Sequence, residues 1–177
     1  MRSAIVYEGN QSGSAEIARL IAAEAAGHGP VIVGEVGEIP VSELEGVDFL
    51  VVGGPTHHCD PVAEALRGSS AAHVLRESHP PNNGVRRWLE RLPARPGFSA
   101  ATFDTREPGL RVLTGTAALG LYRALRRHGC HLVTRPASFL VAPGADNELL
   151  DGEQERASSW AVTVFRRAEH HHPVHVG

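Results

Sequence analysis

The stretch from Ser3 to Ala26 constrains the fold most, because it predicts a strand, a polar loop and a helix in immediate succession. Residues 3–7 are rich in β-forming side chains and too short for a core helix, which indicates a buried strand. Helical spacing then relates four apolar residues: Ile17, Leu20, Ile21 and Ala25. Gly27 ends this predicted helix.

The loop between this strand and this helix, residues 8–14, combines glycines with small polar residues. Small residues let backbone N–H groups approach a ligand, hydroxyls add donors, and the positive end of a helix dipole favours an anion. A phosphate is the guest that this chemistry predicts. The alternative is an ordinary tight turn between a strand and a helix, which many α/β domains contain.

Strand and helix patterns alternate along the rest of the chain. Further strands are predicted at residues 31–36, 49–52 and 98–103, and a last one at 132–141 is interrupted by Pro136. Further helices are predicted at 85–92, from about 114 to 127, and from 151 to 168. Residues 57–83 form an unusually long connection, which inside a compact domain is typical of a functional or mobile segment.

Composition narrows the class of protein. A chain of 177 residues with 42% hydrophobic content can build one domain with a sizeable core. The net charge of −3 gives no electrostatic reason to expect nucleic acid or an anionic membrane as a partner. Two cysteines are too few for a disulfide framework, and no apolar run is long enough to span a membrane, so a cytoplasmic setting is expected.

This alternation predicts an α/β fold with helices on both faces of an open parallel sheet. Five strands joined by right-handed crossovers commonly take the order 2-1-3-4-5, and their ligand crevice opens between the first and third strands. The loops at that crevice would be residues 9–14, 53–60 and 104–106. These three loops have the most unusual composition in the chain.

Two motifs resemble the flavodoxin family, and in particular actinobacterial flavodoxin-like proteins. They are Gly53-Gly54-Pro55-Thr56-His57, after the third predicted strand, and Phe103-Asp104-Thr105-Arg106, after the fourth. The resemblance implies a flavodoxin-like three-layer domain over residues 1–168, followed by a His-rich tail at 169–177. It also implies an FMN cofactor and a role in electron transfer.

The resemblance assigns cofactor contacts to three loops. The phosphate would be held by the first loop: Gly9, Asn10, Gln11, Ser12, Gly13 and Ser14. The isoalloxazine ring would lie between the other two: Pro55, Thr56, His57 and His58 on one side, and Asp104, Thr105 and Arg106 on the other. A guanidinium near the flavin N1 would stabilise its reduced anion, so Arg106 suggests two-electron reduction.

The chain departs from the family pattern in three respects. The glycine of the first loop is displaced by one position, and the first hydroxyl is missing. Glu16 stands in the first turn of the helix, where its carboxylate competes with a phosphate for the helix dipole. The predicted ring-binding segments contain no Trp or Tyr, so only imidazole is available for stacking.

Three functions fit these residues. The first is an FMN-binding electron carrier or small FMN-dependent reductase that works with a redox protein partner. The second is a flavodoxin-like scaffold that has lost flavin and acts as a binding or regulatory protein. The third is a hydrolase or reductase that uses His57, His58 and Cys59. No metal site is expected, because adjacent ligands such as residues 57–60 seldom converge on one ion and the C-terminal histidines suit a solvated tail.

Overall fold

The computed structural model describes residues 1–9, 13–56, 83–108, 116–143 and 148–171. The first half of the chain contains β1 (Ser3–Tyr7), α1 (Gly13–Ala25), β2 (Val31–Glu35), the short 3-10 helix η1 (Val41–Leu44) and β3 (Phe49–Pro55). The second half contains α4 (Asn83–Glu90), β4 (Ser99–Arg106), α6 (Ala117–Arg127), β5 (His131–Leu132), β6 (Ala137–Leu140) and α7 (Glu153–His171).

The strands form one parallel sheet in the order β2-β1-β3-β4-β5, as the sequence predicts. β1 lies between β2 and β3, with Tyr7 paired to Glu35 on one side and to Gly53 on the other. The carboxyl ends of these three strands therefore lie side by side, at the edge where α/β proteins bind ligands.

The last strand position is divided into β5 and β6, and both parts pair with β4. Ala100 is paired with Leu132, and Phe103 with Ala137, so the edge segment holds two more residues than β4 over this interval. Pro136 lies in this interruption and lacks the N–H that a continuous ladder would need. The predicted strand with a proline interruption is confirmed.

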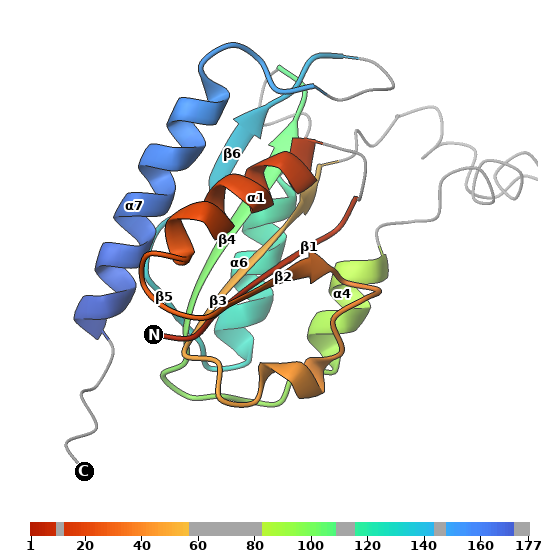
Figure 1. Ribbon diagram of the computed structural model, residues 1–177. Coiled ribbons are helices and arrows are strands. Elements are labelled where there is room, and N and C mark those ends of the chain that lie inside the picture. The colour runs from red at the N-terminus through yellow and green to blue at the C-terminus, as the bar shows by residue number, and fades with distance from the viewer. Residues whose placement is uncertain (10–12, 57–82, 109–115, 144–147, 172–177) are drawn as a thin grey trace, which may run out of the picture.

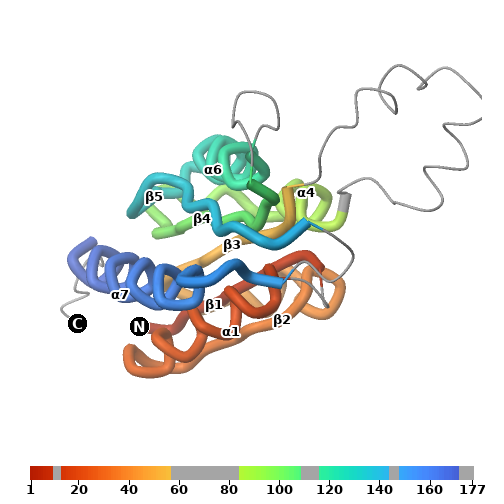
Figure 2. The backbone as a smooth tube through the Cα atoms, turned by 90° about the horizontal axis from the view of Figure 1, so that it is seen from above, coloured from red at the N-terminus to blue at the C-terminus, as the bar shows by residue number. Residues whose placement is uncertain are grey.

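Helices cover both faces of the sheet, with α1 and α7 on one side and α4 and α6 on the other (Figures 1 and 2). Side chains alternate along each strand and so supply both cores. Within β1, Ile5 packs toward α1 and α7, whereas Val6 packs toward α4 and α6. The three-layer flavodoxin-like architecture is confirmed.

Several side chains that could have belonged to a site are instead part of the cores. Trp88 is buried, and its indole N–H donates to the carbonyl of Ile39 at 2.6 Å. Trp160 packs edge-on against Phe103 and Phe139. Cys130 is buried, and burial raises its thiol pKa to about 11, although the positive charge of Arg95 acts in the opposite direction.

The predicted ends of two strands are wrong. β3 continues through Gly53, Gly54 and Pro55, and β4 continues through Asp104, Thr105 and Arg106, which the sequence analysis had assigned to loops. The two extensions stabilise one another, because Gly54 pairs with Asp104 and Pro55 with Thr105. Asp is rare in strands, so the pattern of side chains alone favoured a loop.

The C-terminal helix is longer than the sequence pattern predicted. α7 continues to His171, three residues beyond the predicted end at Ala168, and residues 172–177 lie outside the described part of the chain. Within the described residues, no helix is both long and apolar enough to cross a membrane.

Candidate functional site

Direct hydrogen bonds join the start of α1 and the carboxyl ends of β3 and β4. The hydroxyl of Ser14, in the first turn of α1, lies 2.7 Å from the hydroxyl of Thr105 at the end of β4. The backbone N–H of Thr56, just after β3, donates to the carbonyl of Thr105 at 2.7 Å. Three segments that are distant in the sequence therefore meet around Thr105.

A second network ties these strand ends to the start of α6. The Thr56 hydroxyl donates to Oδ2 of Asp104 at 2.7 Å and accepts the N–H of Ala117 at the same distance. The same carboxylate oxygen accepts the N–H of Ala118 at 2.9 Å. Asp104 thus places a negative charge at the positive end of the α6 dipole, which stabilises both.

Asp104 is completely buried, and its other oxygen, Oδ1, has no hydrogen-bond partner among the described residues. A buried carboxylate oxygen without a donor is unusual in a native structure.

Thr116, the N-cap residue of α6, accepts the N–H of Leu119 with its own side chain. The start of α6 is therefore held by side chains of the chain itself.

The other three described helices that begin at this edge also have a carboxylate within or beside their first turn. Glu8 lies against the first turn of α4, where its Oε2 is 3.5 Å from the N–H of Val85. Glu16 lies in the first turn of α1 and accepts the side-chain amide of Gln154 at 2.5 Å. Glu153, the first residue of α7, accepts the N–H of Leu140 and pairs with Arg156.

Glu35 is a member of this edge that the sequence analysis missed. Its Oε1 accepts the backbone N–H of Gly9 at 3.2 Å, so a carboxylate contacts the first residue of the predicted phosphate loop. Gly9 has a φ of 99°, a conformation that glycine adopts without strain. The predicted strand order could have identified Glu35, because the order 2-1-3-4-5 places the end of β2 beside the end of β1.

Arg106 is the basic residue that the sequence analysis placed near the flavin. It ends β4, is 9% exposed, and donates from Nη1 to the carbonyl of Glu107 at 3.2 Å. Its position at the carboxyl edge is the one predicted. Its contact with a flavin stays a prediction.

The thirteen predicted cofactor contacts divide into two groups. The structure describes eight of them, all at the carboxyl edge of the sheet: Gly9, Gly13, Ser14, Pro55, Thr56, Asp104, Thr105 and Arg106. The other five lie outside the described residues: Asn10, Gln11, Ser12, His57 and His58. Cys59 also lies outside them, so the hydrolase alternative stays untested.

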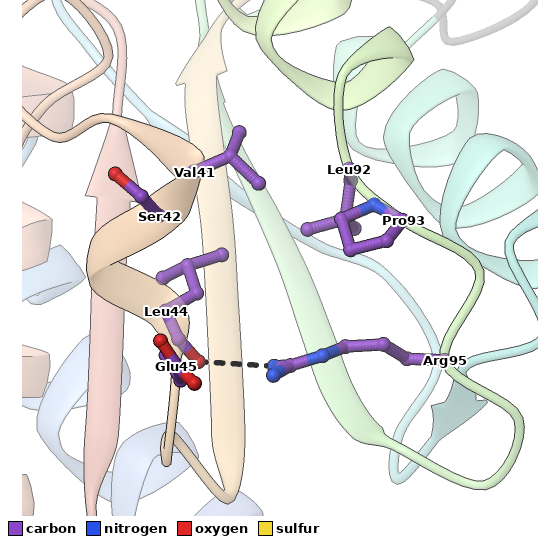
Figure 3. A pocket seen from close by; sticks show the side chains of 7 residues that line it. All are labelled: Val41, Ser42, Leu44, Glu45, Leu92, Pro93 and Arg95. Atoms are coloured by element: carbon purple, nitrogen blue, oxygen red, sulfur yellow. Dashed lines mark hydrogen bonds between the residues drawn. The ribbon is translucent and has the colours of Figure 1, made fainter.

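A hollow of about 310 Å³ lies at the opposite end of the sheet, between η1 and the segment that leads from α4 into β4 (Figure 3). Arg95 crosses it and donates to the carbonyl of Leu44 at 3.1 Å. This end holds the amino ends of β3 and β4, away from the edge that binds ligands in such folds.

Among the described residues, no group of three or more His, Cys, Asp and Glu could hold a metal ion.

The described residues fit the phosphate of FMN poorly. The Ser14 hydroxyl is completely buried and bonded to Thr105, the Gly9 N–H is bonded to a carboxylate, and Glu16 occupies the first turn of α1. A phosphate at the start of α1 would meet carboxylates where a helix N-terminus ordinarily offers it positive potential.

Comparisons with known proteins bear on the fold. Neither a protein-family model nor a curated relative matches the chain. Among solved structures, flavodoxin 2 from Bacillus cereus is 19% identical, with a TM-score of 0.63, and the match covers 94% of this chain and 99% of that one. A flavodoxin from Streptococcus pneumoniae TIGR4 is 15% identical, with a TM-score of 0.66, and the match covers 94% and 99%.

A third similar structure is a short-chain flavodoxin associated with a non-canonical PDU bacterial microcompartment. It is 14% identical, with a TM-score of 0.66, and the match covers 95% of this chain and 99% of that one. At such identities the likeness shows the fold, which is that of the flavodoxins over nearly the whole chain. The narrower resemblance to actinobacterial proteins stays a prediction.

Proposed function

We propose that this chain, which has the fold of the flavodoxins, binds a flavin at the carboxyl edge of its sheet and transfers electrons to or from a redox protein partner. FMN is the flavin that the sequence motifs predict. A cytoplasmic setting is part of the same proposal. The observation that supports it best is the meeting of the start of α1 with the ends of β3 and β4 around Thr105.

The residues of this edge can perform two tasks for a bound flavin. The network of Thr56, Asp104 and the α6 N-terminus fixes the ends of β3 and β4, and a rigid edge loses little entropy when a ligand binds. Arg106 supplies a positive charge at the end of β4, where it would favour the anionic reduced flavin. A bound flavin would supply the redox chemistry itself, because no side chain accepts electrons as readily.

An absorbance spectrum is the direct test of this proposal. Protein purified without a nickel-affinity step should show the absorbance bands of a flavin. If it is purified without the cofactor, micromolar protein should change the fluorescence of added FMN. A nickel step is avoided because a run of histidines such as the C-terminal one would take up that metal adventitiously. Failure of both FMN and riboflavin to bind would overturn the proposal.

The second candidate is a flavodoxin-like scaffold that acts as a binding or regulatory protein without flavin. It is favoured by one observation, namely that Glu35 contacts the predicted phosphate loop at Gly9 and that Glu16 occupies the first turn of α1. The spectrum and the two titrations separate the candidates, because a scaffold would remain colourless and bind neither flavin.

A further inference from the structure

Carboxylates lie at the first turns of the four described helices that begin at the carboxyl edge of the sheet. Asp104 bonds the first turn of α6, Glu8 approaches that of α4, and Glu16 and Glu153 belong to the first turns of α1 and α7. Elsewhere in proteins, these helix ends stabilise bound anions. Here the chain supplies the anions itself.

Glu35 is a carboxylate from outside the predicted phosphate loop that contacts it directly. It ends edge strand β2, is paired in register with Tyr7, and reaches the N–H of Gly9, two residues further along the chain. A second carboxylate, that of Glu38, accepts the backbone N–H of Glu35 at 3.3 Å. The loop therefore faces negative charge from β2 as well as from Glu16 in α1.

FMN and riboflavin share the ring and the ribityl chain and differ in the phosphate, which carries about −1.5 to −2 charges at neutral pH. The resemblance to flavodoxins places that phosphate in the first loop. Among the described residues of this loop, the N–H of Gly9 is already bonded to Glu35, and the helix start that follows the loop carries Glu16. The phosphate would gain little from the helix and would be repelled by both carboxylates.

We infer that the flavin site of this protein does not select the phosphorylated form, and that Glu35 is the residue that removes the preference for FMN over riboflavin. The inference rests on the proposed function, since it assumes that a flavin binds at this edge. On this inference, the affinity for a flavin comes from its ring and its ribityl chain. It also gives Glu35, which the sequence motifs do not single out, a role in specificity.

The test is a pair of fluorescence titrations of the full chain, one with FMN and one with riboflavin. We expect the two dissociation constants to agree within about threefold. Glu35→Gln keeps an oxygen for the Gly9 N–H and removes the charge, so it should tighten FMN binding by about five- to tenfold and leave riboflavin binding unchanged. Glu43→Gln is the matched control, because it removes one exposed charge from η1, remote from the carboxyl edge.

Ionic strength gives a second readout that does not depend on a variant. Salt screens repulsion between the carboxylates and the phosphate, so raising it should tighten FMN binding to the natural chain and leave riboflavin binding unchanged. The inference is overturned if the natural chain binds FMN more than tenfold more tightly than riboflavin, or if Glu35→Gln changes both affinities equally. Those outcomes leave the proposed function standing, whereas binding of neither flavin overturns both.

Discussion

Gly53 is a residue whose identity is fixed by packing rather than by a turn. It lies within β3, and a Cβ atom there would overlap the buried ring of Phe103. That ring is itself held edge-on by Phe139 and Trp160, so it has little room to move away. The glycine is therefore part of the packing that joins β3 to β4 beneath the candidate site.

Replacing this glycine tests that packing. Gly53→Ala should lower the free energy of unfolding by about 1–3 kcal/mol, because overpacking displaces a rigid aromatic ring. Urea denaturation followed by circular dichroism measures the change. Gly37→Ala is the control, since a Cβ at Gly37 would meet no atom within 4 Å, and equal behaviour of the two variants would contradict the packing argument.

Asp104 is the other residue whose substitution is informative. Asp104→Ala removes the acceptor for the Thr56 hydroxyl and the Ala118 N–H, and we expect a loss of about 3 kcal/mol in the free energy of unfolding. Asp104→Asn keeps an oxygen for these donors and should cost about 1 kcal/mol. Exposed Asp151→Ala is the control, and an Asp104→Ala variant as stable as that control would show that the network contributes nothing.

At the scale of elements, His28 joins the C-terminal end of α1 to α7. Its ring stacks on Phe165 with centroids 5.1 Å apart, and its two nitrogens contact carboxylates of Glu169, at 2.7 Å, and Glu24, at 3.4 Å. The hydrogen bond to Glu169 is the largest cause of a raised His28 pKa, burial opposes it, and Glu24 adds to it. Protonated His28 therefore stabilises the contact between the two helices.

This contact predicts a pH dependence of stability. A raised pKa in the folded state means that the stabilisation is complete below the ordinary value of 6.5 and is lost as the pH rises through the folded-state value above it. The loss should be about 0.5–1 kcal/mol, because the groups are partly exposed. Urea unfolding between pH 5.5 and 8.5 measures it, and His28→Gln should lack this component; an identical profile for the variant would disprove the assignment.

At the scale of the whole molecule, the order of elements was predictable because alternating strands and helices leave few topologies for a parallel sheet. Glu35 could also have been placed, since the predicted order sets the end of β2 beside β1. The contacts of Thr56 and Asp104 with α6 could not, because they depend on β4 continuing as a strand through residues whose composition favours a loop. The roles of Asn10 to Ser12 and of His57 and His58 stay predictions.

The two cores share one sheet, and this sets how the molecule unfolds. Val51 belongs to the core under α1 and α7, whereas its neighbours in β3, Leu50 and Val52, belong to the core under α4 and α6. A strand cannot leave one core and remain in the other, so the described layers should unfold as one cooperative unit. Each core contains one of the two tryptophans of the chain, Trp160 in the first and Trp88 in the second.

Single-tryptophan variants test this cooperativity. In Trp160→Phe, the fluorescence of Trp88 should report the same urea midpoint as far-ultraviolet circular dichroism, and in Trp88→Phe the fluorescence of Trp160 should do so. Each substitution lowers the stability of the protein, and for Trp88 the loss includes the hydrogen bond to Ile39. Because both probes are measured on the same variant, this loss does not affect the comparison of their midpoints. Different midpoints from fluorescence and circular dichroism in either variant would contradict this prediction. They would mean that one helical layer detaches before the sheet unfolds.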